Sequence, residues 1–458
     1  MSTTKKIQWI ITFLLPICLY FYIGTTSIAY ELKMFFVCTS FVILIMAFDF
    51  FHMLVPAIML PGLYLLFNVA PVSTVYSPWT GTTIWMILGA TVLSNVMEDT
   101  GLLRRIALIC IKTLGGSFRG VLWGVLIAGI IANIVTFCNS WIIVIALIVG
   151  VCKSMDYKPG SKEAILLMLV LELVVCGATI PVFSPIQIGI INNGAQAVLP
   201  DFAIQWFHTY LYAAPMFLFM AIILIVWMKM LNAKQLGGSG EKEYFEQELQ
   251  RMGKMSIEEK KTAFITLLLV LFLLTNPIHG IDVAYAFLIL PLLLFFPGIN
   301  VGKKQALDRI NISLFAFIGT CMAIGTVGSA VGMSSLITTT LVPLLEGKST
   351  IVVLYVILII GMFVNFLMTP AGLNACLSTP VTQISMDLGI NPMAPLLTMF
   401  MGMDQVFLPY EVTSILLVFS YGFISMKDFI KYNLIKTVLY FVFFGLIQIP
   451  FWKLLGLI

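Results

Sequence analysis

Apolar runs of about 17 to 25 residues, the length that crosses a bilayer as a helix, recur along almost the whole chain. Hydrophobic residues make up 60% of the 458 residues and charged residues only 10%, far from the composition of soluble globular proteins. The sequence therefore predicts an all-α polytopic membrane protein. About 11 transmembrane helices are expected, over residues 8–27, 33–50, 53–70, 82–97, 163–190, 206–231, 261–275, 283–296, 310–330, 395–419 and 430–455.

Two further pairs of apolar segments resemble re-entrant helical hairpins, over residues 118–137 with 140–152 and 350–368 with 373–387. Each pair carries an asparagine between small residues where a turn is expected, in Cys138-Asn139-Ser140 and in Leu373-Asn374-Ala375. A polar amide at membrane depth is costly unless it binds something. Each hairpin is followed by an apolar helix interrupted by proline, at Ser184-Pro185 and at Leu408-Pro409.

A polar segment at about 232–261 divides the chain into two halves, 1–231 and 262–458, each with one hairpin and one broken helix. Matching interruptions in two inverted repeats are typical of the substrate site of secondary transporters. Hydrocarbon cannot satisfy the backbone groups of a broken helix, which therefore survives only inside protein or beside a water-filled cavity. The exposed helix N-termini attract anions, while unwound carbonyls and helix C-termini hold cations.

The distribution of basic residues predicts the orientation in the cell membrane, because Lys and Arg favour cytoplasmic loops. With a cytoplasmic N-terminus, 22 of the 25 Lys and Arg residues fall on the inner side, Lys427, Lys431 and Lys436 among them. The linker at 232–261 is then cytoplasmic and the C-terminus extracytoplasmic. This bias accounts for the net charge of +4, so the charge gives no indication of nucleic-acid binding.

The titratable residues argue against an enzyme. The eight cysteines lie in or beside apolar segments without metal-ligand spacing, and the three histidines lie near span ends. A membrane-embedded hydrolase would need a nucleophile with a base, or a metal-binding carboxylate pair, at membrane depth. We therefore expect no catalytic residues, no metal site and no cofactor other than a coupling ion such as Na⁺. A passive channel remains an alternative, which uphill transport would exclude.

Three stretches resemble the divalent anion/sodium symporter family, whose members carry di- and tricarboxylates or sulfate. Met97–Leu108, which reads MEDTGLLRRIAL, is similar to the family's stretch after the fourth span. Gly253–Lys261 is similar to its linker before the seventh span, and Lys427–Lys431 to its entry into the last span. The resemblance implies a homodimer in which a transport domain carries both hairpins across the membrane as an elevator, past a fixed scaffold domain.

The resemblance also identifies where this chain departs from the family. The paired Ser-Asn-Thr hairpin motifs fall on Cys138–Ser140 and Leu373–Ala375, so both asparagines match but the leading serines are lost. Family hydroxyls at these positions help to bind carboxylates and sodium, so their loss puts sodium coupling and dicarboxylate preference in doubt. Thr369 does match a sodium-site threonine of the family.

The family's site loops correspond to Gly177–Gln187 and Pro409–Ser414. The candidate substrate and ion site is therefore predicted to comprise Thr136, Cys138, Asn139, Ser140, Gly177, Thr179, Ser184, Pro185, Thr369, Asn374, Ala375, Glu411, Thr413 and Ser414.

Several polar and charged residues, inside and outside this candidate site, could instead have a purely structural role. Asn139 and Asn374 could serve as interhelical hydrogen-bonding groups. Glu172 and Asp404 could be buried in protonated form or lie nearer the interface than the predicted boundaries. Glu411 lies beside a helix-breaking proline in the expected site loop, where a protonatable carboxylate could replace sodium as the coupling element. The charges from Glu98 to Arg105 are typical of an interfacial cluster rather than a substrate site.

The sequence thus predicts a secondary active transporter of small anions in the lipid bilayer, with di- or tricarboxylates as the first substrate class. Symport with a cation, proton coupling and exchange all stay open. The two hairpin turns and the two broken-helix loops contain no Lys or Arg. The anion would therefore be held by helix dipoles, amides and hydroxyls, together with a bound cation.

Overall fold

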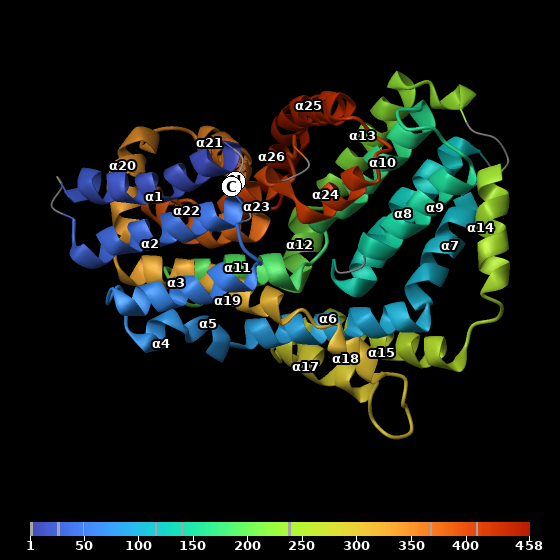
Figure 1. The fold of residues 1–458 in the computed structure, drawn as a ribbon, viewed down its shortest axis with the longest axis horizontal. Helices are drawn as coiled ribbons and strands as arrows, with labels where there is room; N and C mark the ends of the chain where they lie inside the picture. The colour runs from blue at the N-terminus through green and yellow to red at the C-terminus, as the bar shows by residue number, and fades with distance from the viewer. Residues whose placement is uncertain are drawn as a thin grey trace.

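The computed structural model describes residues 3–24, 28–48, 50–114, 117–138, 141–236, 240–366, 369–408 and 411–458. Every regular element in these ranges is helical (Figure 1). The first half contains α1 Thr3–Gly24, α2 Tyr30–Ala47, α3 Leu54–Leu66, α4 Val72–Val75, α5 Ser77–Thr80, α6 Thr82–Thr100, α7 Leu102–Leu114, α8 Phe118–Thr136, α9 Trp141–Ser154, α10 Lys162–Val175, η1 Gly177–Thr179, α11 Pro185–Gln196, α12 Trp206–Tyr212, α13 Pro215–Met230 and η2 Ala233–Gln235.

The remainder begins with α14, which belongs to the polar linker. It contains α14 Gly240–Arg251, α15 Ile257–Leu274, α16 Asn276–His279, α17 Val283–Leu293, α18 Lys304–Asp308, α19 Ile312–Ala330, α20 Met333–Leu345, α21 Thr350–Asn365, α22 Pro370–Asp387, α23 Met393–Gly402, α24 Thr413–Ser420, α25 Met426–Phe443, the π-helical turn η4 Phe444–Gln448 and α26 Ile449–Leu454.

Few of these helices are long spans. By length and composition, three helices in the described ranges can cross a membrane, namely α8, α19 and the continuous stretch Met426–Leu454. The pair α12 and α13, bent by 49°, adds a fourth if it forms one span. Five shorter apolar helices of 10–17 residues accompany them. The predicted spans at 163–190 and 395–419 are each two helices separated by an unwound segment. The exact number of transmembrane helices therefore stays a prediction.

The two halves repeat one local arrangement around these breaks. In the first, the paired helices α8 and α9 precede α10, an unwound segment at 176–184 and α11. In the second, α21 and α22 precede α23, an unwound segment at 403–408 and α24. Asn133 near the end of α8 donates to the Val174 carbonyl at 2.8 Å, and Asn365 at the end of α21 donates to the Met403 carbonyl at 3.3 Å. At each break, the side-chain amide of an asparagine from the preceding helix pair thus satisfies a backbone carbonyl.

The repeats meet where α11 packs against α22 (Figure 1). The helices approach closely at Gly194, because a Cβ there would lie only 2.7 Å from the Cβ of Ser378. The hydroxyl of Thr379 donates to the Gly194 carbonyl at 2.9 Å. Small residues at a helix crossing of this kind drive association in membranes through close packing.

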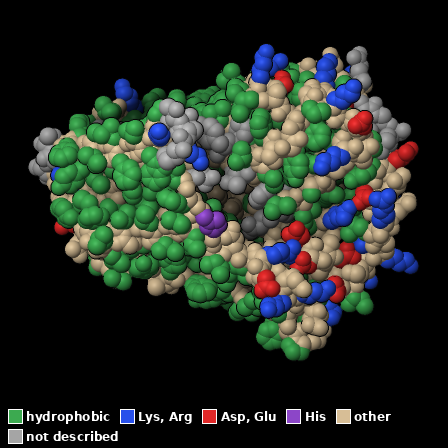
Figure 2. Space-filling model, in the orientation of Figure 1, with side chains coloured by type: hydrophobic (Ala, Val, Ile, Leu, Met, Phe, Trp, Pro, Cys, Tyr) green, Lys and Arg blue, Asp and Glu red, His purple; other side chains and the backbone are tan. Residues whose placement is uncertain are grey.

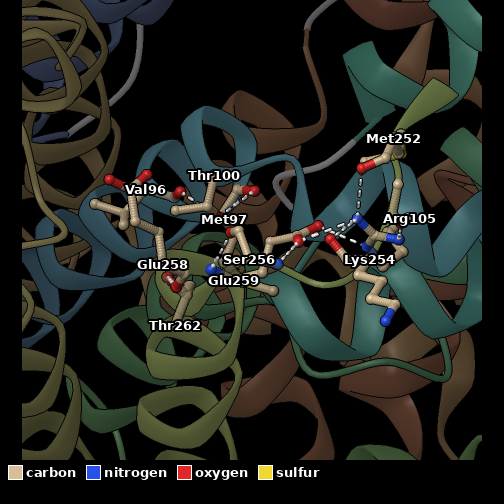
Figure 3. Close-up of polar contacts among 11 residues, drawn as sticks. Val96, Met97, Thr100, Arg105, Met252, Lys254, Ser256, Glu258, Glu259 and Thr262 are labelled. Carbon is tan, nitrogen blue, oxygen red and sulfur yellow. Dashed lines mark hydrogen bonds and ion pairs between the residues drawn. The ribbon is translucent and has the colours of Figure 1, made fainter.

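The linker is fixed to the first half by Arg105 on α7 (Figure 3). Its guanidinium contacts both carboxylate oxygens of Glu259, at 2.7 and 3.1 Å, and the carbonyl of Gly253 at 2.9 Å. Its neighbour Arg104 pairs with Glu248 of α14. The charges of this stretch therefore hold the linker and the start of α15, in agreement with the interpretation as an interfacial cluster.

The surface separates apolar from charged side chains (Figure 2). Hydrophobic side chains cover the part of this face formed by α1 to α3 and α20, and those of Ile10, Phe13 and Leu14 are about half exposed. Acidic and basic side chains gather at the opposite end, beside α14, α15 and α18. An apolar exposed surface of this kind fits contact with lipid.

Candidate functional site

The first broken helix supplies a buried polar segment between α10 and α11. Ser184 is the N-cap of α11 and Pro185 its first residue, the pattern that begins helices because proline needs no N–H partner there. Both side chains are buried. Gly177 begins η1, where a Cβ would lie 3.8 Å from Oδ1 of Asp404, so this break adjoins the second one. The Thr179 hydroxyl donates to the Cys176 carbonyl at 2.6 Å.

The second broken helix is organised by Glu411. Its Oε1 accepts hydrogen bonds from the backbone N–H groups of Phe407 at 3.0 Å and Leu408 at 2.7 Å. Its Oε2 accepts from Nδ2 of Asn365 at 3.0 Å. Three N–H donors point at the two carboxyl oxygens, which replace the helical acceptors that the backbone groups of Phe407 and Leu408 lack. Ser414, which follows in α24, is buried; of Thr413 the structure describes the backbone only.

Asn374 joins the two halves. Its Nδ2 donates to Oε1 of Gln187 on α11 at 2.7 Å and lies 3.9 Å from the sulfur of Met403 in the second break. The side chain of Asn374 is fully buried, and its Oδ1 has no partner in the structure. A buried amide oxygen without a donor is unusual, so this atom is available to a ligand. Ala375 beside it is buried as well.

The expectation that Asn374 lies at a hairpin turn is wrong. Thr369 is the N-cap and Pro370 the first residue of α22, so Asn374 lies in the second turn of the helix. Thr369 itself is exposed, and its hydroxyl accepts from the Gly372 N–H at 3.4 Å. Both α11 and α22 thus begin with a hydroxyl cap and proline, and Gln187 and Asn374 lie close to these two N-terminal ends.

The tip of the first hairpin reaches the first break. Cys138 has a left-handed backbone with φ +68°, and its sulfur lies 4.0 Å from the Val182 carbonyl. Thr136 is buried, and its hydroxyl donates to the Ala132 carbonyl of its own helix at 2.7 Å. The hydrogen of this hydroxyl is therefore not available to a ligand. Asn139 and Ser140 lie outside the described residues.

Lys436 is a residue that the sequence interpretation misplaced. It was assigned to a cytoplasmic loop, but it lies in α25 with no exposed surface. Its Nζ is 2.5 Å from Oε1 of Glu172 and donates to the backbone carbonyl of Asp404 at 2.8 Å, with Oδ2 of Asp404 at 3.8 Å. Glu172 and Asp404 are therefore buried in the protein and paired with Lys436.

A surface cavity of about 650 Å³ lies elsewhere. It is lined by residues after the C-terminal ends of α11 and α22, among them Asp201, Phe202 and Asn391. Gln187 and Asn374 are near the opposite ends of these helices. The cavity is thus separate from the Gln187–Asn374 contact.

Comparison with known proteins gives the family. Residues 4–458 match the family described as the sodium:sulfate symporter transmembrane region. The chain belongs to this family. It is the divalent anion/sodium symporter family that the sequence motifs resemble, so that prediction is confirmed. The family so described is one of membrane transporters rather than of enzymes, and the apolar helices of this chain fit a multi-pass membrane protein.

Individual relatives are distant. A membrane protein of Cupriavidus necator is 24% identical over 253 residues, which cover 54% of this chain and 49% of that protein. The chain thus aligns with only about half the length of this curated relative.

Two solved transporters share the fold. The YdaH transporter of Alcanivorax borkumensis has a TM-score of 0.57 and 14% identity, over 84% of this chain and 88% of that chain. MtrF of Neisseria gonorrhoeae, from a class of antimetabolite efflux pumps, has a TM-score of 0.54 and 17% identity, over 80% and 81%. At these identities the likeness concerns the fold alone.

Two of the motif positions in this chain carry side chains that bear on sodium binding. The family's name associates it with sodium, whereas Cys138 supplies a sulfur and Leu373 a buried aliphatic side chain at the two positions that the motif resemblance aligns with serines. Hard cations prefer oxygen ligands. Neither of these two side chains is therefore suited to hold a sodium ion.

Proposed function

We propose that this chain is a secondary active transporter of small anions, with di- and tricarboxylates as the first substrate class. In this proposal the solute binds where the N-terminal ends of α11 and α22 meet, between the two unwound segments. The observation that carries the proposal is the contact of Asn374 with Gln187, which links the two halves. Oδ1 of Asn374 has no partner, so the two facing amides can reverse together, and Nδ2 of Asn374 then turns its N–H groups to the anion.

The electrostatics of this position suit an anion. Helix N-termini present unpaired backbone N–H groups and a partial positive charge, and here two of them lie on adjacent helices. The side-chain amides of Gln187 and Asn374 add adaptable hydrogen-bonding groups. A carboxylate held in this way needs no arginine, in keeping with the absence of Lys and Arg from the predicted loops.

The transport movement that we propose is an elevator. The two repeats around the breaks, α8 to α11 and α21 to α24, would form the moving transport domain. The other helices would form the scaffold of a homodimer. The support is that α11 packs on α22 and α21 on α23 at glycines that admit no side chain. A Cβ at Gly361 would lie 2.9 Å from the Met399 carbonyl, so these helices can move only together.

Coupling in this proposal does not need sodium at the two hairpin motifs. Glu411 places a carboxyl group at the second break, where three N–H donors stabilise its ionised form. This geometry favours a role in charge balance during exchange or proton-coupled uptake. Charge balance at the break then depends on Glu411 and on the cations that face it.

The test is uptake of radiolabelled anions into proteoliposomes, over a panel of mono-, di- and tricarboxylates and sulfate. Sodium and proton gradients are imposed separately, and internal unlabelled anion is varied to detect exchange. We expect saturable uptake of one anion class that persists when choline replaces sodium. Strict dependence on sodium would refute the proposed coupling, and non-saturable flux down the gradient would indicate a channel.

A further inference from the structure

The buried cluster around Lys436 has a chemistry that the proposed function does not yet use. Glu172 from α10 and Asp404 from the second break face the ammonium, and none of the three side chains has more than 2% exposed surface. Two of the three N–H donors of Lys436 go to Glu172 and to the Asp404 carbonyl. An isolated lysine in such a place would cost several kcal/mol, so these oxygens must compensate its charge.

The position of the ammonium is that of a bound cation. The carbonyl of Asp404 lies just beyond Gly402, the last residue of α23, where the helix ends in an unwound segment. Helix C-termini and unwound carbonyls carry partial negative charge and are the groups by which broken helices of transporters hold cations. Three oxygens, one of them such a carbonyl, surround Nζ at 2.5, 2.8 and 3.8 Å.

The cluster also has unused oxygen atoms. Oε2 of Glu172 and Oδ1 of Asp404 are buried without hydrogen-bond partners. One ammonium faces two carboxylates, so the oxygens exceed what a single lysine can pair. A hard cation placed at Nζ would find an oxygen-rich environment without any new ligand.

We propose that Lys436 is a tethered cation that takes the place of a dissociable coupling ion at the second broken helix. The proposal rests on the proposed transport function and specifies its coupling. Because the ammonium is covalently attached, the charge at the end of α23 is neutralised in every step of the cycle. The transporter therefore needs no sodium at this position, and removing the ammonium creates a sodium site.

The experiment compares purified wild type, Lys436→Ala, Lys436→Arg and the matched control Lys431→Ala, whose lysine lies on the same helix and is exposed. Thermal unfolding is followed at increasing NaCl concentration, with choline chloride at equal ionic strength. Sodium should raise the Tm of Lys436→Ala in a saturable manner, because an ion that binds only the folded state stabilises that state. The other three proteins should show no difference between the two salts.

Uptake of the transported anion is then measured for the same proteins. Lys436→Ala should transport at least about ten-fold faster in sodium than in choline, since occupancy of an empty site follows the free ion concentration. Wild type, Lys436→Arg and Lys431→Ala should be indifferent to the salt. If Lys436→Ala does not fold, the double variant Glu172→Gln with Lys436→Ala is used, because it removes one buried negative charge while the amide oxygen of the new glutamine, the carboxylate of Asp404 and the emptied position of Nζ remain available to sodium.

The outcomes separate this proposal from the proposed function. A folded Lys436→Ala or double variant that gains neither sodium-dependent stability nor sodium-dependent uptake overturns the tethered cation. Wild type stabilised by sodium as strongly as Lys436→Ala overturns it too, because a dissociable ion would then bind beside the lysine. Failure of wild type to transport any anion refutes the proposed function alone, since the Tm comparison does not depend on transport.

Discussion

Asn374→Ala should abolish uptake without unfolding the protein. The substitution removes the hydrogen bond to Gln187, and a hydrogen bond of this kind contributes about 1 kcal/mol net to stability. Gln187 is only half-buried, so water can replace the lost donor at its Oε1. If an N–H group of Asn374 Nδ2 donates to the anion, however, the lost charge-assisted bond is worth about 1.5 to 3 kcal/mol. That corresponds to roughly 10- to 150-fold weaker binding, so uptake should be lost at anion concentrations that half-saturate the wild type.

The control is Thr379→Val on the same helix. It removes the Thr379 hydrogen bond to the Gly194 carbonyl at the same α11–α22 crossing and costs a similar amount, about 1 to 2 kcal/mol. Initial rates over a range of anion concentrations and thermal unfolding are measured for both variants. We expect similar Tm values but loss of uptake only in Asn374→Ala. Uptake by Asn374→Ala equal to that of Thr379→Val would show that Asn374 is only a structural contact between helices.

Three further predictions concern other parts of the chain. Asn139→Ala should also abolish uptake while the protein still elutes as a folded species, and near-normal transport would remove Asn139 from the site. Glu411→Gln should fold, because the amide oxygen of glutamine can still accept from the N–H groups of Phe407 and Leu408, and should flatten the pH dependence of uptake; an unchanged pH profile would exclude Glu411 from coupling. A cysteine placed at Gly238 should react with an impermeant thiol reagent only after the cells are opened, and labelling from outside intact cells would reverse the predicted orientation.

The break before α11 was predictable and the one after α23 only in part. Ser184-Pro185 has the cap and proline of a helix start, and the structure begins α11 there. The second interruption was predicted at Pro409, but α23 already ends at Gly402. A Cβ at Gly402 would lie 2.8 Å from the Leu358 carbonyl, so contact with another helix determines this region. That contact leaves no local pattern in the sequence.

Asn374 illustrates a conflict between two sequence signals. Alignment with a family motif suggested a turn at Leu373–Ala375, whereas Thr369-Pro370 is itself a helix-start pattern that predicts α22. The local capping signal was the better guide to structure. The contact with Gln187 joins residues 187 positions apart and could not be read from either signal.

The sequence contains a weak indication that Lys436 is buried, which a count of basic residues on each side of the membrane does not take into account. Asn433, Lys436 and Thr437 recur at helical spacing in a largely apolar helix, which indicates one polar face directed into protein rather than lipid. Its partners could not be predicted, because Glu172 is 264 positions away in the sequence. Charged side chains within the membrane have to be paired, but only the tertiary structure identifies their partners.

The measurement that tests the central claim most directly is accumulation against a gradient. Proteoliposomes are loaded with unlabelled anion, or given an inward proton gradient in sodium-free medium, and the labelled anion inside is followed over time. The proposed transporter predicts a transient internal concentration of label above the external one, which Asn374→Ala lacks. Label that only rises to the external concentration under every imposed gradient would contradict secondary active transport.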